Sequence, residues 1–164
     1  MKEIFVLSKT WAKQFRSEKP WAAISISTEV GDFPILNDAN RVELLQLQFW
    51  DIANPRLFAE AALAGKIFRM DQARQVLEFA ARVWPKIEVL MVHCEMGLRR
   101  SPAMAAALTH IYEGPGTEEK YFHNFQPNEH VYQMILSMHY GKPFFITMKP
   151  KPEEVLDEPW DPTT

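Results

Sequence analysis

The feature that most constrains the fold is an apolar run, EVLMV at residues 88–92, that leads directly into the segment HCEMGLRRS. The run has the length and composition of a strand buried in the middle of a parallel sheet. A helix is predicted next, from about Pro102 to Tyr112, because the segment is rich in Ala and Met and proline suits a first helical turn. Strand, loop and helix in this order place the loop at the carboxyl end of a strand.

The rest of the chain continues the alternation of strands and helices. Further strands are predicted at residues 3–7, 21–27 and 42–49. Helices are predicted within residues 9–19, 57–65, 71–84 and 118–125, and after residue 128. We expect Asp71 and Asn128 to be the N-caps of the helices that follow them. The pattern predicts an α/β fold: a single domain with a mainly parallel central sheet flanked by helices.

Composition bounds the class of protein. The chain has 164 residues, of which 47% are hydrophobic, so one domain at residues 1–148 has ample material for a core. The remainder, residues 149–164, holds four prolines and five acidic against two basic residues, and is expected to be an extended or disordered tail. That tail accounts for the whole formal net charge of −3. The neutral body argues against strong nucleic-acid binding.

The single cysteine excludes an intrachain disulfide and fits a reducing compartment. The first residues, MKEIFVLSKT, lack the apolar core of a secretory signal, and no apolar run has the length of a membrane span. The sequence therefore predicts a cytoplasmic protein with no membrane association.

The segment HCEMGLRRS has the residue types that phosphate chemistry needs. A loop closing onto a helix N-terminus can aim several N–H groups at an anion, and Gly97 permits backbone angles closed to other residues. Arg100 can hold two phosphate oxygens through its planar fork. The same positive field stabilises a thiolate at Cys94, which can attack phosphorus in line. Ser101 can donate a hydrogen bond to the sulfur.

With Cys, five residues, Arg and Ser, preceded by His, this segment resembles the H-C-x-x-G-x-x-R-S/T signature of the cysteine-dependent protein tyrosine phosphatase superfamily. The resemblance spans roughly residues 21–140, implies a tyrosine-phosphatase-like fold, and implies neither a metal nor a cofactor. It assigns phosphate binding to the loop residues Cys94, Glu95, Met96, Gly97, Leu98, Arg99 and Arg100. His93 would support the loop without touching substrate. Met96 and Arg99 stand where smaller residues are common in the family.

A general acid must protonate the leaving oxygen. In dual-specificity phosphatases this Asp follows a strand upstream of the cysteine, and the segment FWDI here resembles the F-x-D-I segment of small bacterial tyrosine phosphatases of that type. We therefore expect Asp51 to be the acid and Asp71, which a capping role explains, to be the competing candidate. The unusual length between Asp51 and Cys94 suggests that residues 53–70 form either a flap over the site or a decoration.

The resulting hypothesis is a protein phosphatase that hydrolyses phosphotyrosine, with phosphoserine and phosphothreonine left open, through a cysteinyl-phosphate intermediate. Two alternatives stay open: an RNA 5′-phosphatase or phosphoinositide phosphatase with the same Cys–Arg loop, and a phosphate-binding module without turnover. A sulfurtransferase of the rhodanese type fits the His–Cys pair and the final Arg–Ser poorly. Oligomeric state is not predicted.

Overall fold

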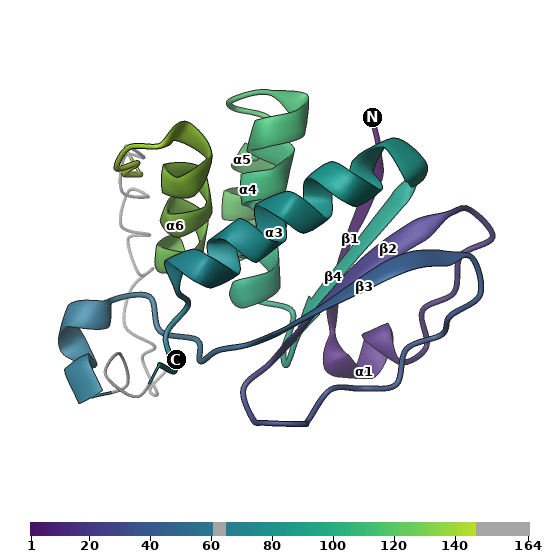
Figure 1. Ribbon diagram of the computed structural model, residues 1–164, viewed down its shortest axis with the longest axis horizontal. Helices are drawn as coiled ribbons and strands as arrows, with labels where there is room; N and C mark the ends of the chain where they lie inside the picture. Colours follow the sequence, from purple (N-terminus) through teal and green to yellow (C-terminus); the bar gives the residue numbers. More distant parts are fainter. Residues whose placement is uncertain (61–64, 147–164) are drawn as a thin grey trace, which may run out of the picture.

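A four-stranded parallel sheet forms the centre of the computed structural model, which describes residues 1–60 and 65–146 (Figure 1). Its strands run in the order β1, β4, β2, β3, and each neighbouring pair is parallel. Their bounds are β1 Glu3–Ser8, β2 Trp21–Ser27, β3 Arg41–Gln48 and β4 Val89–Cys94. The predicted α/β class is confirmed, and in the described part of the chain the sheet is wholly parallel.

The two inner strands, β2 and β4, are buried along their whole length because both faces of the sheet are covered. Alternate residues of β2 enter two different cores: Ala22 and Ile24 belong to the larger one and Trp21 and Ala23 to the smaller one. This division follows from the two-residue period of a strand. It explains why both segments read as continuous apolar runs in the sequence.

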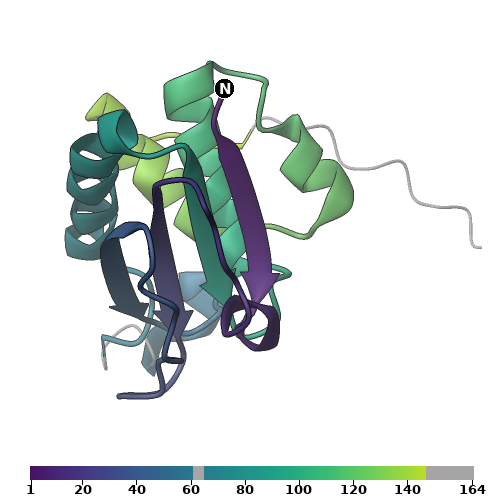
Figure 2. The same cartoon turned by 90° about the vertical axis from the view of Figure 1, so that its right-hand side faces the viewer.

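Helices cover the two faces unequally (Figures 1 and 2). The described helices are α1 Lys9–Ala12, α3 Met70–Val83, α4 Arg100–Glu113, α5 Glu119–Asn124 and α6 Glu129–Tyr140, with short 3₁₀ turns at Pro55–Leu57 and Trp84–Lys86. The helices α3, α4 and α6 pack over one face, and the short α1 lies at the other. The helix α4 is buried from Arg100 to His110, which matches its alanine-rich sequence.

Several predicted boundaries differ from the structure. The helix predicted from Asp71 begins at Met70, because the Gln72 side chain accepts the backbone N–H of Arg69, so Asp71 lies inside the first turn and is not the N-cap. Asn128 does cap α6, since its Oδ1 accepts the N–H of Val131 at 3.1 Å. The helix within residues 9–19 is a single turn.

Two predictions reach beyond the described residues. The helix expected at 57–65 overlaps a 3₁₀ turn at Pro55–Leu57, and residues 61–64 lie outside the described ranges. The acidic tail expected at 149–164 also lies outside them. Among the described helices, none combines the length and the apolar character required to span a bilayer.

Candidate active site

The loop predicted to carry the chemistry connects β4 to α4 at the carboxyl edge of the sheet. The strand extends further than predicted and ends at Cys94, opposite Ser8 of β1. Gly97 adopts φ +71°, and a Cβ there would stand 2.7 Å from the carbonyl carbon of Leu7. The loop therefore requires glycine at this position for two reasons, the left-handed backbone and the contact with β1.

Cys94 lies at the floor of this loop, with only 2% of its surface exposed. Its Sγ accepts the backbone N–H of Gly97 at 3.2 Å, and Ser101 Oγ lies 3.1 Å from it. A backbone donor and a hydroxyl thus converge on one sulfur atom at the start of a buried helix. Such an arrangement stabilises negative charge on the sulfur or on an anion bound above it.

His93 supports the loop from inside the sheet. It is fully buried, its Nε2 contacts Ser25 Oγ of β2, and its Nδ1 lies 3.3 Å from the carbonyl oxygen of Cys94. Burial lowers the pKa of His93, and the nearby cations Lys9 and Arg100 act in the same direction against its hydrogen bond to Cys94. Burial therefore favours the neutral form of this histidine, which is placed to orient the backbone of the cysteine.

Arg100 reaches across the ends of β2 and β3. Its Nη1 donates to the backbone carbonyl of Phe49 at 2.8 Å and to Thr28 Oγ1 at 2.8 Å, and only 6% of the residue is exposed. These two acceptors fix the plane of the guanidinium. The sequence did not point to Thr28 or to the Phe49 carbonyl, because neither belongs to a recognisable motif.

Asp51 follows β3 and lies against the same loop. Its Oδ2 forms an ion pair with Arg99 Nε at 2.9 Å, and its Oδ1 accepts the Asn128 side-chain N–H at 2.7 Å. Asn128 is fully buried and also donates its backbone N–H to the Arg99 carbonyl at 2.9 Å. The end of β3, the start of α4 and the start of α6 therefore meet at this carboxylate. The contact between Asn128 and Asp51 adds to the capping role that the sequence predicts for Asn128.

The competing carboxylate, Asp71, has a different setting. It pairs with Arg69 at 2.9 Å at the exposed start of α3, where the hydrogen bond from Arg69 lowers the pKa of Asp71. This contact accounts for Asp71 without any role in the loop. Of the two carboxylates, the structure brings Asp51 to the predicted phosphate loop.

The opposite rim of the loop carries another ion pair. Lys9 donates its backbone N–H to the Glu95 carbonyl at 3.1 Å, and its Nζ pairs with Asp32 at 2.8 Å. Met96 and Leu98 are exposed at the loop surface, by 68% and 52%. The mouth of the loop therefore combines apolar side chains with two cations, Lys9 and Arg99, that are each matched by an aspartate.

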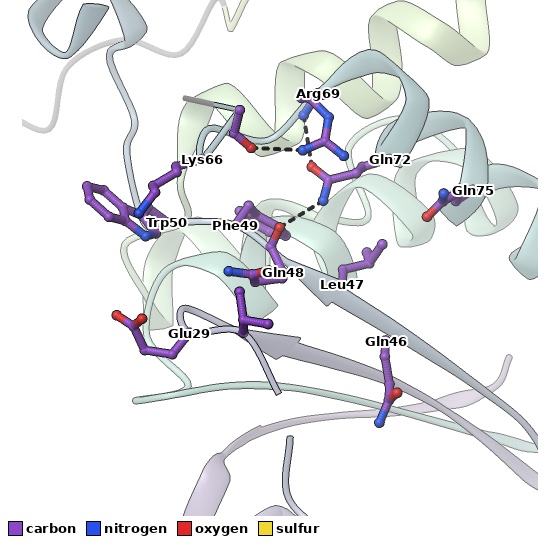
Figure 3. Close-up of a pocket in the computed structure, with 12 residues that line it drawn as sticks. Glu29, Gln46, Leu47, Gln48, Phe49, Trp50, Lys66, Arg69, Gln72 and Gln75 are labelled. Atoms are coloured by element: carbon purple, nitrogen blue, oxygen red, sulfur yellow. Dashed lines mark hydrogen bonds between the residues drawn. The ribbon is translucent and has the colours of Figure 1, made fainter. Parts of the chain in front are cut away.

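A pocket of about 430 Å³ lies beside this site, along the outer edge of the sheet (Figure 3). Its wall includes five consecutive residues of β3 and its end, 46–50, together with the start of α3. Lys66 Nζ lies 4.6 Å from the Trp50 ring centre, a cation–π contact. Gln72 Nε2 donates to the Gln48 carbonyl at 2.9 Å and closes one side. Because Trp50 precedes Asp51, this pocket begins next to the candidate acid.

Within residues 1–60 and 65–146, no three side chains of His, Cys, Asp or Glu are grouped so that they could hold a metal ion. The groups that the structure brings together at this loop are a cysteine sulfur, an arginine guanidinium, backbone donors and a carboxylate. Together these groups match the demands of phosphoryl transfer, namely positioning and stabilisation of negative charge.

No family model and no curated protein matches the sequence. Solved structures do match. Tk-PTP in its active form aligns over 85% of this chain and 93% of its own, with a TM-score of 0.53 at 12% identity. Human DUSP28 aligns over 84% and 92%, with a TM-score of 0.50 at 17% identity. OH1 from the Orf virus, described as a tyrosine phosphatase with triple substrate specificity, aligns over 84% and 83%, with a TM-score of 0.50 at 13% identity. At these identities the matches establish a shared fold.

Proposed function

Because the chain has the fold of the dual-specificity and tyrosine phosphatases, we propose that it hydrolyses phosphate monoesters with Cys94 as the nucleophile. The observation that carries this proposal is the convergence on one sulfur: the Gly97 N–H at 3.2 Å and Ser101 Oγ at 3.1 Å, at the N-terminus of α4. A buried cysteine of the core needs neither donor. A thiolate under a bound phosphate needs both.

In the first step the Cys94 thiolate attacks phosphorus, so that an S–P bond forms as the P–O bond to the leaving group breaks. Arg100 holds the transferred group. Its Nη1 is fixed by Phe49 and Thr28, so that Nε and Nη2 are left to donate to two phosphate oxygens. Asp51, as the acid, gives its proton to the leaving oxygen, which departs as an alcohol or a phenol.

In the second step water attacks the phosphocysteine, and the S–P bond breaks. Asp51, now a carboxylate, takes a proton from this water. Ser101 donates a hydrogen bond to the departing sulfur, which leaves as a thiolate. Inorganic phosphate is then released. Because Asp51 gives up a proton in the first step and takes one in the second, the enzyme returns to its starting protonation state.

Phosphotyrosine in a protein is the proposed substrate, with phosphoserine and phosphothreonine as weaker ones. The exposed side chains of Met96 and Leu98 at the mouth of the loop suit the faces of an aromatic ring. The pocket beside Trp50 gives room for a chain that continues from the phosphorylated residue (Figure 3). An inositol lipid or an RNA 5′ end would call for a larger excess of unpaired cations than the described rim offers.

Hydrolysis of p-nitrophenyl phosphate tests this function. We expect turnover by the wild type, inhibition by vanadate, and complete loss in Cys94→Ser with an unchanged circular dichroism spectrum. Because the sequence has one cysteine, loss of activity on alkylation also reports this residue alone. Unchanged turnover in Cys94→Ser would overturn the proposal. Tight phosphopeptide binding without any hydrolysis by the wild type would favour a binding module.

Rates on a phosphotyrosine peptide, an inositol phospholipid and a triphosphate-ended RNA separate the substrate classes. The peptide is expected to be the fastest of the three. The acid is tested by comparing Asp51→Asn with the matched variant Asp71→Asn. Only the first should slow turnover, and it should slow phenyl phosphate far more than p-nitrophenyl phosphate, whose leaving group needs little protonation.

A further inference from the structure

We propose that Arg99 recognises a carboxylate beside the phosphotyrosine of an acidic peptide, and that this contact releases Asp51 for catalysis. The inference rests on the proposed function and adds a substrate class to it. It starts from one ion pair, Arg99 Nε to Asp51 Oδ2 at 2.9 Å, that joins the phosphate loop to the candidate acid.

The resting arrangement of Asp51 is unsuited to an acid. The proton that it must donate occupies one of its two oxygens. Oδ1 already accepts the N–H of the buried Asn128, and Oδ2 faces the cationic Arg99. Asn128 is fixed, because it also caps α6. Of the two partners, Arg99 is therefore the one that must move before Oδ2 can carry a proton.

Arg99 is placed for such a movement. Its backbone is held, because its carbonyl accepts the N–H groups of Ala103 and Asn128. Its side chain is 39% exposed, and that of Asp51 is 30% exposed. Ion pairs with this much exposure contribute little net stability, so a substrate carboxylate can replace Asp51 as the partner of the guanidinium at small cost.

The surroundings favour a peptide as the carrier of that carboxylate. The pocket beside Asp51 runs along β3, which is one of the two edge strands of the sheet in the described part of the chain (Figure 3). Glutamine side chains form part of its lining, and two of them, Gln48 and Gln72, already hydrogen-bond to backbone groups. Extended peptides use such edges through their backbone groups. A chain that continues from the phosphotyrosine past Asp51 toward Trp50 brings its neighbouring residues close to Arg99.

The exchange fits the first chemical step. With Arg99 on the substrate carboxylate, Asp51 Oδ2 can keep the proton that it took from the attacking water in the second step of the previous cycle. It delivers this proton to the tyrosine oxygen as the P–O bond breaks and the S–P bond forms. A neutral peptide leaves Arg99 on Asp51 and so reacts more slowly. The expected preference for an acidic neighbour is about twofold to fivefold in kcat/KM, the size of a partly exposed charge pair.

The test uses two phosphotyrosine peptides that differ only by Glu or Gln on either side of the phosphotyrosine. The wild type should prefer the Glu peptide, Arg99→Gln should lose the preference, and Arg99→Lys should recover part of it. Arg82→Gln, which removes the exposed Arg82–Glu43 pair of α3 and β3, is the matched control and should behave as the wild type. Binding of both peptides to Cys94→Ser supplies a second readout that needs no turnover.

The outcomes separate the two proposals. Equal rates and equal binding for the two peptides, in a protein that hydrolyses p-nitrophenyl phosphate, overturn the role of Arg99 and leave the phosphatase intact. If Arg99→Gln still prefers the Glu peptide, the role of Arg99 is likewise overturned and the phosphatase function stands. Faster turnover of an inositol phospholipid than of either peptide, again lost in Arg99→Gln, would reassign the anion to a lipid and overturn the peptide proposal. If the wild type hydrolyses no phosphate ester, both the phosphatase function and the role of Arg99 are overturned.

Discussion

Gly97, in the loop between β4 and α4, and Leu7 at the end of β1 are in backbone contact, since a Cβ atom on Gly97 would stand only 2.7 Å from the Leu7 carbonyl carbon. This contact holds the loop that follows β4 against the neighbouring strand β1. The neighbouring strand occupies the space that any other side chain would need. The shape of the loop is therefore set by β1 as well as by its own residues.

Gly97→Ala is expected to deform the loop. An added methyl group meets backbone atoms of Leu7 and Ser8, and it also disfavours the φ of +71°. We expect a loss of about 2 kcal/mol or more in the free energy of unfolding and a fall of at least tenfold in kcat/KM. Gly141→Ala is the matched control, since Gly141 has φ +67° and nothing within 4 Å of its Cβ position. It should cost about 1 kcal/mol and leave kcat/KM unchanged.

Arg100→Lys is expected to remove at least a hundredfold of kcat/KM, roughly the effect of deleting a donor to transition-state charge. A lysine cannot bond the Phe49 carbonyl and Thr28 Oγ1 and also hold two phosphate oxygens. Steady-state kinetics with p-nitrophenyl phosphate measure the effect. Arg82→Lys, on the outer surface of α3, serves as the control. An Arg100→Lys enzyme within threefold of the wild type would contradict the proposed fork.

Ser101→Ala is expected to slow breakdown of the phosphoenzyme more than its formation. Ser101 Oγ lies 3.1 Å from Cys94 Sγ, and a hydrogen bond to a charged group contributes about 1.5–3 kcal/mol, or roughly 10- to 150-fold in rate. Rapid-quench kinetics should therefore show a larger burst of nitrophenol followed by a slower steady state. A variant in which burst and steady state fall together would show that the hydroxyl acts before the intermediate forms.

The loop was predictable from the sequence because its parts are neighbours in the chain. Strand, glycine and helix start all lie within residues 89–103, and local patterns identify them. The contacts of Arg100 were not predictable, since Thr28 and Phe49 are 72 and 51 positions away and meet it only through the strand order β4, β2, β3. A list of strands in sequence does not fix their order in a sheet.

The two aspartates differ in the same way, because one depends on a contact between distant segments and the other on the exact start of a helix. A family resemblance in the sequence points to Asp51, and the contact of Asp51 with Arg99 depends on how β3 ends beside the loop. Asp71 was predicted to be an N-cap, which is wrong by two positions because the side chain of Gln72 holds the backbone of Arg69 and starts α3 earlier. Helix patterns locate a helix well, but tertiary and side-chain contacts choose its first residue.

The fold is expected to lose stability as the solution becomes acidic, partly through the buried His93 and the half-buried His130. Burial lowers the pKa of both His93 and His130 in the folded protein, while in the unfolded chain each returns to about 6.5. Below that pH the unfolded state binds more protons, so the free energy of unfolding falls as pH decreases from about 6.5 toward the folded pKa values.

Urea unfolding between pH 7.5 and 5.5 measures this dependence. His93→Gln should make the decline shallower, by at most about 1.4 kcal/mol per pH unit, whatever its effect on stability at pH 7.5. An unchanged slope in His93→Gln would show that His93 does not contribute to acid sensitivity.

Tyr132→Phe is expected to destabilise the protein without affecting its chemistry. Tyr132 donates to Glu118 Oε1 at 2.9 Å inside a buried network with His110. Burial alone would raise the pKa of Glu118, but hydrogen bonds from His110, its own backbone and Tyr132 prevail and lower it. Removing one donor from this carboxylate should cost about 1–3 kcal/mol at pH 7.

The loss of unfolding free energy in Tyr132→Phe should depend on pH in a direction that identifies Glu118 as its cause. A carboxylate whose folded pKa is depressed stabilises the fold above about pH 4.5 and loses that contribution as pH falls through the folded value. The difference between wild type and Tyr132→Phe in urea unfolding should therefore shrink at low pH. Tyr112→Phe is the control, because in residues 1–60 and 65–146 the Tyr112 hydroxyl has no hydrogen-bond partner, and it should cost much less. Turnover per folded molecule at pH 7 should equal that of the wild type in both variants, since neither hydroxyl contacts the loop around Cys94.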